Sequence, residues 1–365
     1  MAGGLDLKME VLSSSTCTLC GACLDWCPYL KNLEDHLVMR FDCGVTDGRC
    51  YATCPRTFTD WQEIEHEFLP DAASDLYVGA SLKVVKVKGA SVTSGQQDGG
   101  TVSALLRCAQ EEKEFSAALL TGSADGITPQ PFLARSLEEI QAAAGSRYLA
   151  APGLRFINDE TVAQDQLLVV GRPCQIQALR KRQRLEAAKG QPREYISIGL
   201  FCTWQLGWDF KDYLLERYPG QKPERIAIPQ HGLEVTVDGK QCPVPMDDVR
   251  RYIRPACGYC LDMCAELADI SVGALEAEPG WNVAMIRSQK GKELFELAVQ
   301  RGYLIVEDYA EEEFARLKGA SLNKKARNLN NLRQAAEQGR LKPFVDLDKD
   351  EYKQIMELAE GKVKQ

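Results

Sequence analysis

The chain has 365 residues, of which 45% are hydrophobic and 26% are charged, as is ordinary for a globular protein of two or three domains. Its formal net charge of −8 argues against nucleic acid as a partner, and no stretch approaches the ~18 consecutive apolar residues of a membrane span. Peripheral association with a membrane complex is still compatible with this composition. Residues 1–15 lack the basic and apolar regions of a signal peptide, so we expect a cytoplasmic protein.

The chain contains 14 cysteines, and the first run of them predicts an iron–sulfur site. In the cytoplasm cysteines act as thiolate ligands more often than they form disulfides. The spacing Cys17-x2-Cys20-x2-Cys23-x3-Cys27-Pro28 resembles the bacterial ferredoxin motif, in which the first three thiolates bind one 4Fe–4S cluster and the fourth binds a neighbouring one. A zinc site or a disulfide framework is the alternative, but zinc sites usually pair two short knuckles and disulfide scaffolds are small secreted domains.

A second, imperfect copy of the motif ends at Cys54-Pro55. Counting back along the ferredoxin template, Cys50 is the third ligand, Asp47 stands where the second belongs, and Cys43 is one residue out of register. Such a site holds either a 3Fe–4S cluster or a fourth iron bound through the carboxylate; otherwise it is empty and Asp47 only forms a turn. Pairing across the two motifs assigns one cluster to Cys17, Cys20, Cys23 and Cys54, and the other to Cys27, Cys43 and Cys50, with Asp47 as a further ligand.

The order of segments predicts an α/β (α+β) core between a ferredoxin-like module and a helical C-terminal region. We expect the module over residues 1–70, a connector over 71–88 that enters a strand at Leu82–Val87, the core over 89–290 and the helical region over 291–365. Short apolar runs predict buried strands at Ala117–Leu120, Leu167–Val170 and Ile196–Phe201. Helices are expected at Thr101–Glu112, Ser136–Ala144 and Ile176–Lys189, and a β-hairpin at His231–Val244 with Asp238-Gly239 at its turn.

One stretch of the C-terminal region is locally basic. Its positive residues are Lys318, Lys324, Lys325, Arg327 and Arg333. We expect a solvated helix face there in preference to a docking surface for an anionic cofactor or partner.

Glycines precede the first expected core helix, in Asp98-Gly99-Gly100-Thr101. Glycine lets the backbone approach a ligand closely, and a helix N-terminus favours phosphate, so this turn suits the diphosphate of a dinucleotide. Other distinctive blocks follow along the chain: Ala142–Tyr148, Gly171–Lys181, Gly199–Cys202 and Cys257–Gly273. In the last block, Cys257-x2-Cys260 is a chelating pair, and spacing alone would add Cys264.

These five ordered blocks, starting from Ser94, resemble the family of beta subunits of coenzyme F420-reducing hydrogenase and formate dehydrogenase over about residues 85–345. The ferredoxin-like module is found only in some members of that family. The resemblance implies a flavoprotein core that binds FAD and one 4Fe–4S cluster. It implies FAD contacts at Ser94, Gly95, Gln97, Asp98, Gly99, Gly100, Thr101, Ser146, Arg147 and Tyr148. It implies cluster ligands at Cys174, Cys202, Cys257 and Cys260, which leaves Cys264 as a buried bystander or substitute.

The expected function follows from this cofactor set. FAD exchanges a hydride with coenzyme F420, and three iron–sulfur clusters carry single electrons to or from a catalytic oxidoreductase subunit of a larger complex. Exchange with NADH, or a pure electron relay without a diffusible substrate, are the alternatives. The chemistry belongs to FAD, so no catalytic side chain is expected: the three histidines are not spaced as metal ligands, and Asp262, Glu266 and Asp269 are expected as turn and capping groups. Cys108 and Cys242 are expected as ordinary core residues.

Overall fold

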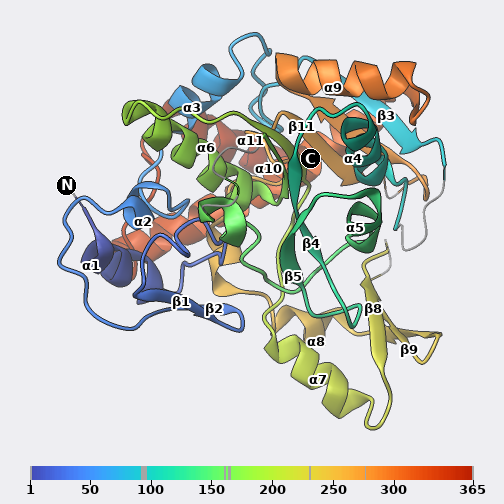
Figure 1. Ribbon diagram of the computed structural model, residues 1–365. Helices are drawn as coiled ribbons and strands as arrows, with labels where there is room; N and C mark the ends of the chain where they lie inside the picture. The colour runs from blue at the N-terminus through green and yellow to red at the C-terminus, as the bar shows by residue number, and fades with distance from the viewer. Residues whose placement is uncertain are drawn as a thin grey trace.

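The computed structural model describes residues 2–91, 97–159, 162, 166–229, 232–275 and 277–363. Within these ranges the chain forms an eight-stranded mixed sheet, a three-stranded antiparallel sheet and a two-stranded hairpin, together with the surrounding helices (Figure 1). The strands are β1 (Leu30–Leu33), β2 (His36–Met39), β3 (Lys83–Gly89), β4 (Ala117–Gly122), β5 (Gln130–Ala134), β6 (Leu167–Gly171), β7 (Tyr195–Leu200), β8 (Pro223–Ala227), β9 (Leu233–Val237), β10 (Lys240–Val244), β11 (Ile270–Ala274), β12 (Asn282–Ile286) and β13 (Leu304–Asp308). The α-helices are α1 (Gly4–Leu7), α2 (Arg49–Ala52), α3 (Trp61–Phe68), α4 (Thr101–Glu111), α5 (Leu137–Ala142), α6 (Pro173–Ala188), α7 (Asp209–Arg217), α8 (Met246–Arg250), α9 (Gln289–Gln300), α10 (Glu311–Glu337) and α11 (Asp350–Val363).

The large sheet has the strand order β13-β3-β12-β11-β7-β6-β4-β5. Strands β11, β7, β6 and β4 pair with one another in parallel. On one side β12, β3 and β13 are added in that order, each antiparallel to the strand before it, and on the other side β5 pairs antiparallel with β4. Its inner strands are nearly continuous apolar runs, because helices cover both faces and leave no solvated side. The four predicted strands in this sheet are confirmed as β3, β4, β6 and β7, and the three predicted core helices as α4, α5 and α6.

Alternate residues of β4 divide the core into two layers. Ala118 and Leu120 pack with residues of α4, α5 and α9, whereas Ala117 and Leu119 pack with residues of α6 on the opposite face. Such alternation is what the two-residue period of a strand requires when both faces are buried. The expected layered α/β core is therefore present.

The N-terminal region consists of short elements joined by loops, and it packs against the α6 side of the large sheet. Cys20 and Ala22 belong to the same buried cluster as Leu119 of β4. Gly21 has φ +92°, and a Cβ at this position would lie 2.7 Å from the carbonyl oxygen of Pro152. Only glycine therefore allows this close contact between the cysteine loop and the core.

A buried ion pair provides a second link between the N-terminal region and the core. Arg254 Nη1 lies 2.7 Å from Asp35 Oδ2, and both side chains are largely excluded from solvent. Arg254 Nη2 also donates to the backbone carbonyl of Cys17 at 3.2 Å. The β1–β2 hairpin and the first cysteine loop are thus both attached to the segment that precedes Cys257.

The small sheet, in the order β10-β9-β8, forms a lobe with α7 and α8 (Figure 1). The predicted hairpin is confirmed as β9–β10, and its turn residues Asp238 and Gly239 have φ values of 47° and 74°. Positive φ at both positions fits the turn that the Asp-Gly pair predicts. His231, at the start of the predicted hairpin, lies outside the described residues.

The C-terminal region contains the expected helices α9, α10 and α11, but it also contains an unexpected strand. β13 pairs antiparallel with β3, from Leu304 opposite Gly89 to Asp308 opposite Val85. The strand has only five residues, and only Leu304 at its start is buried. Such a short alternation of apolar and charged side chains does not predict a strand within a charged segment.

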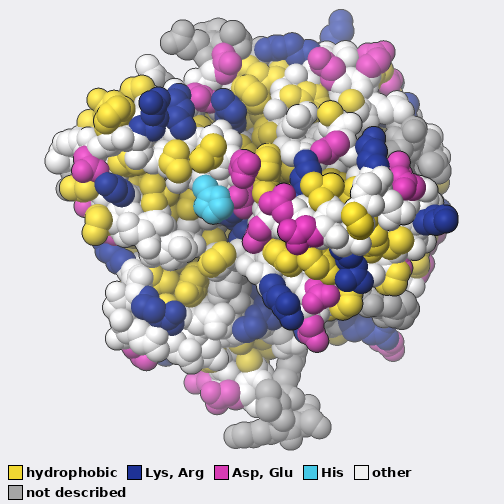
Figure 2. All heavy atoms as spheres, turned by 90° about the horizontal axis from the view of Figure 1, so that it is seen from below, with side chains coloured by type: hydrophobic (Ala, Val, Ile, Leu, Met, Phe, Trp, Pro, Cys, Tyr) yellow, Lys and Arg dark blue, Asp and Glu magenta, His cyan; other side chains and the backbone are white. Residues whose placement is uncertain are grey.

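Charges of both signs are mixed on the molecular surface. On the face shown in Figure 2, Lys and Arg side chains are scattered among acidic and apolar ones. Among the described residues, none of the helices combines the length and the hydropathy needed to cross a membrane.

Candidate functional site

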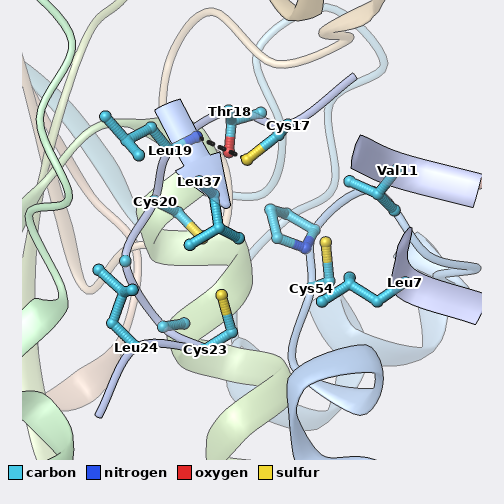
Figure 3. Close-up of a pocket in the computed structure, with 13 residues that line it drawn as sticks. Leu7, Val11, Cys17, Thr18, Leu19, Cys20, Cys23, Leu24, Leu37 and Cys54 are labelled. Carbon is cyan, nitrogen blue, oxygen red and sulfur yellow. Dashed lines mark hydrogen bonds between the residues drawn. The ribbon is translucent and has the colours of Figure 1, made fainter. Parts of the chain in front are cut away.

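Four predicted ligands surround one pocket in the N-terminal region, and we call them the first thiol set: Cys17, Cys20, Cys23 and Cys54. Figure 3 shows their sulfur atoms facing a common space. Most of the remaining lining is apolar, from Leu7, Val11, Leu19, Leu24, Leu37 and Pro55. The first motif therefore contributes three cysteines and the second motif contributes Cys54, which is the pairing that the ferredoxin template predicts.

The chemistry of this pocket fits an iron–sulfur cluster. Leu19 N donates to Cys17 Sγ and Arg56 N donates to Cys54 Sγ, both at 3.4 Å, and N–H···S bonds of this kind tune cluster potentials. Burial raises the pKa of all four thiols, and that of Cys54 to about 11. An apolar pocket disfavours bare thiolates, so a cationic metal centre would stabilise them.

Among the described residues there is no group of three or more His, Cys, Asp or Glu side chains that could hold a single metal ion. A cluster of several irons bridged by sulfides is larger than one ion, so its thiolate ligands are spread more widely.

The second thiol set consists of Cys27, Cys43 and Cys50. Burial raises the pKa of the Cys50 thiol, and the neighbouring Cys27 and Cys43 thiols raise it further. Gly4 and Gly48 pack closely around this set: a Cβ at Gly4 would lie 2.6 Å from Cys43 Cβ. Asp47, the predicted carboxylate ligand, is exposed in the loop between Cys43 and Cys50.

The core thiol set consists of Cys174, Cys202, Cys257 and Cys260, which come from three separate segments. Cys174 lies at the start of α6, Cys202 follows β7, and the Cys257–Cys260 pair lies at a short 3₁₀ turn. The Cys257 thiol interacts electrostatically with Cys260 and Cys174, and Cys202 interacts with Cys257 and Cys174. Gln205 N donates to Cys257 Sγ at 3.3 Å, so this set has an N–H···S bond like those of the first.

Helix α10 holds the core thiol set in place. Lys324 Nζ donates to the carbonyl of Cys202 at 2.6 Å and to that of Asp262 at 2.8 Å. Asn328 Nδ2 donates to the carbonyls of Cys257 at 3.0 Å and Cys260 at 2.7 Å. Burial raises the pKa of Cys202 to about 12, whereas for Cys260 the charges of Lys324 and Arg56 outweigh burial and lower the pKa.

The prediction of a solvated basic face on this helix was therefore wrong for Lys324 and Lys325. Lys324 is 3% exposed and Lys325 is 7% exposed. Lys325 Nζ lies 2.9 Å from Glu266 Oε1 and donates to the carbonyl of Leu76. The sequence alone did not predict the burial of these two lysines, because a charged residue in a polar helix is usually solvated. Their hydrogen-bond acceptors come from segments far away in the sequence, which only the packing of α10 brings close.

The three thiol sets follow one another in space. Cys50 of the second set interacts electrostatically with Cys23 of the first. Cys17 and Cys20 of the first set interact in the same way with Cys174 of the core set. The order is therefore second set, first set, core set.

Cys264 lies apart from the core thiol set in its interactions. Burial raises the pKa of its thiol, and the charge of Glu266 raises that pKa further. Its backbone carbonyl accepts a hydrogen bond from Arg287 Nη2 at 3.2 Å. Asp269 accepts from Ser197 N and Ser288 Oγ and also forms a buried ion pair with Arg180 at 3.1 Å, and Asp262 accepts from Glu266 N. Cys108 is fully buried in α4 and Cys242 is half-buried in β10.

The predicted flavin contacts lie in two loops that meet beside the N-terminus of α4. Gly100, with φ 68°, precedes the helix, and Thr101 Oγ1 donates to Asn282 Oδ1 at 2.8 Å. Gln97 Oε1 accepts from Ser146 N at 3.0 Å and so joins the two blocks. Ser94 and Gly95 lie outside the described residues.

Charged and polar side chains surround the junction of these loops. Arg147 donates to the carbonyls of Ser146 and Ala144, and its buried Nε has no partner. Burial lowers the pKa of Arg147, and the like charge of Arg225 on β8 lowers it further. Burial raises the pKa of Tyr148, with Asp98 adding to the shift, and burial also raises that of Asp98. The position of Arg225 beside Arg147 could not be predicted from the sequence, because the two residues are about 80 positions apart and no local pattern in β8 links them.

Comparison with known proteins relates this arrangement to one family. Residues 84–158 match the model for the coenzyme F420 hydrogenase/dehydrogenase beta subunit N-terminus, and residues 164–312 match that for its C-terminus. The coenzyme F420 hydrogenase subunit beta of Methanococcus voltae is 28% identical over 68% of this chain and 92% of that protein. An F420H2 dehydrogenase subunit of Methanosarcina mazei is 26% identical over 79% of this chain and 84% of that protein.

A solved structure has the same core. A chain of the xenon-derivatised F420-reducing [NiFe] hydrogenase complex from Methanosarcina barkeri aligns with a TM-score of 0.67 and 26% identity, over 73% of this chain and 96% of that chain. Both halves of the family model and a solved relative thus match the region that carries the core thiol set and the glycine-rich turn. The chain belongs to the family of coenzyme F420 hydrogenase/dehydrogenase beta subunits.

Proposed function

We propose that this chain is an electron-transfer subunit in which FAD exchanges a hydride with coenzyme F420 and three iron–sulfur clusters pass single electrons to or from a partner oxidoreductase subunit. The relatives named above are subunits of F420-dependent enzymes, which supports F420 as the hydride partner. The observation that carries the proposal is the convergence of Cys17, Cys20, Cys23 and Cys54 on one apolar pocket, with the second thiol set and the core thiol set beside it. Iron–sulfur clusters are held by sets of thiolates, and clusters in adjacent sets can pass single electrons from one to the next.

The two loops at the start of α4 would hold the flavin. FAD, when bound, supplies the switch between two-electron hydride chemistry and one-electron transfer. Gly99 and Gly100 bring the backbone to the helix N-terminus without side chains, where N–H groups favour a diphosphate. The buried, unpartnered Nε of Arg147 and the nearby charge of Arg225 add positive potential for an anionic ligand.

The thiol sets would hold the clusters, and apolar or charged groups of the chain surround the first set and the core set. Apolar side chains line the first set, N–H groups donate to Cys17, Cys54 and Cys257, and Lys324 offsets negative charge at the core set. Hydrogen bonds, net charge and exposure are the quantities that set a cluster's potential. With Asp47 in place of a cysteine, the second site either keeps a fourth iron through the carboxylate or holds three irons.

The first experiment is anaerobic purification followed by flavin and iron analysis and a turnover assay. Reduction of F420 and of NAD is measured in parallel, with an artificial one-electron donor. We expect about one FAD and about eleven or twelve irons per chain, together with turnover of F420. The matched variants are Cys257→Ser in the core thiol set and Cys242→Ser in β10, away from all three sets.

Three results would change the proposal. Reduction of NAD but not of F420 would identify a nicotinamide, and not F420, as the hydride partner. Flavin and iron without turnover of either would make the chain a relay whose substrate site lies in another subunit. A protein without iron would remove the basis of the proposal altogether. The partner, of formate dehydrogenase, hydrogenase or heterodisulfide reductase type, is identified by co-purification with the intact chain.

A further inference from the structure

Arg56 is buried between the first and the core thiol sets and contacts both. Its backbone N donates to Cys54 Sγ at 3.4 Å. Its guanidinium Nη2 donates to the carbonyl of Ala256, the residue before Cys257, at 3.3 Å. The side chain is 4% exposed, and its guanidinium carbon lies 4.7 Å from the centre of the Phe344 ring.

Among the described residues no carboxylate forms an ion pair with Arg56, and its buried Nε has no hydrogen-bond partner. An unpaired buried cation is costly unless negative charge lies nearby. The groups that supply it are thiols. The charge of Arg56 acts on Cys260, Cys174 and Cys257 of the core set, and on Cys17 and Cys54 of the first set.

Two other buried cations near the thiols act on one set each. Lys181 Nζ donates to the carbonyl of Cys54 at 2.8 Å, and its thiol neighbours are Cys54 and Cys20 of the first set. Lys324 Nζ donates to the carbonyl of Cys202, and its thiol neighbours belong to the core set. Arg56 differs from both because its charge is shared between two sets.

We propose that Arg56 is a positioning residue that couples the first and core clusters by stabilising the reduced form of both. The inference rests on the proposed function, since it requires clusters at both sets. With clusters bound, one electron would leave one cluster and enter the other and no bond would form or break; Arg56 keeps its proton because arginine stays charged in proteins. A shared cation favours an added electron on either side, so it raises the reduction potentials of both clusters.

The test is a redox titration monitored by electron paramagnetic resonance on the full-length protein with its clusters. The variants are Arg56→Met, which keeps a long side chain against Phe344 without the charge, and Arg56→Lys, which restores the charge. The matched controls are Lys181→Met and Lys324→Met, each of which removes a buried cation next to one set. Iron content is measured for every variant.

We expect Arg56→Met to disfavour reduction of both couples by at least about tenfold, which is about 59 mV for a one-electron couple. Arg56→Lys should recover most of that shift. Each lysine variant should move only the couple of its own set. A shift of one couple, or of neither, in an Arg56→Met protein with full iron content would overturn the inference.

Three further outcomes separate a failure of this inference from a failure of the proposed function. If Arg56→Met loses iron, Arg56→Gln, which keeps a donor toward the carbonyl of Ala256, takes its place under the same criterion. If the unaltered protein contains no clusters, the proposed function fails and this inference fails with it. Clusters with unaltered potentials in both uncharged variants would reject the role of Arg56 alone.

Discussion

Removal of the Asn328 side chain should destabilise the loop that carries Cys257 and Cys260. Asn328 is 1% exposed, and its amide donates to two backbone carbonyls, at 3.0 Å and 2.7 Å. Each hydrogen bond contributes about 1 kcal/mol, and a buried carbonyl left without a donor costs about 1–3 kcal/mol. Asn328→Ala should therefore lower the free energy of unfolding by about 2–4 kcal/mol.

The matched control is Asn330→Ala, on the same helix two residues away. Asn330 is exposed, so its replacement should change stability by no more than about 0.5 kcal/mol. Both substitutions gain the same helix propensity, so the difference between the two variants isolates the hydrogen bonds. The proteins are purified anaerobically and compared by urea denaturation and iron content.

We also expect the core set to bind iron less tightly in Asn328→Ala, because the two carbonyls that Asn328 fixes belong to ligand residues. Loss of about four irons per chain would correspond to loss of one cluster. If Asn328→Ala matched Asn330→Ala in both stability and iron content, the view that α10 holds this loop in place would be refuted.

Three other predictions concern different parts of the chain. Cys257→Ser should remove about four irons and Cys242→Ser none, as measured by iron analysis; equal losses would reject the assignment of ligands. Gly99→Ala should cost about 1–3 kcal/mol in thermal or urea unfolding, because its Cβ would lie 2.6 Å from Asn282 Oδ1, whereas Gly361→Ala, with open space around it, should not destabilise. Burial opposes ionisation of Asp125, but hydrogen bonds from Thr128 and Ile127 outweigh it and hold its pKa well below the ordinary value. Its contribution is therefore present above pH ~4 and lost as the pH falls further, so the stability deficit of Asp125→Asn should shrink on acidification; a constant deficit would contradict this.

The cysteines show how far a sequence alone can define a site. Ligand spacing within one short segment is a local property, so Cys17, Cys20 and Cys23 could be grouped from the motif. The ferredoxin template added Cys54 from the second copy. The grouping of Cys174 and Cys202 with Cys257 came from the family resemblance, because no local pattern links residues on α6, after β7 and in a 3₁₀ turn.

Supporting residues that are far from the site in the sequence could not be predicted. Lys324, Asn328 and Arg225 reach their partners only through tertiary packing, and each occupies an element where a polar residue is usually solvated. The same limit applied to β11, β12 and β13, since short strands within mixed sequence give weak periodicity. Strands β4, β6 and β7 were predictable because each contains a short run of apolar residues, and the helices because their amphipathic patterns extend over several turns.

The close packing of the N-terminal region on the core has a consequence for how electrons would move. In enzymes with tethered carrier domains, a swinging motion brings redox centres together, and turnover slows as solvent viscosity increases. Here the contact of Gly21 with Pro152 and the buried pair of Asp35 with Arg254 fix the cysteine loops against the core. The spacing between the thiol sets is thus fixed by the folded chain, and electron transfer between the proposed clusters should be insensitive to viscosity. Under the proposed function the N-terminal region would hold its clusters at a fixed position beside the core, and its removal would expose the apolar face that Cys20 and Ala22 cover.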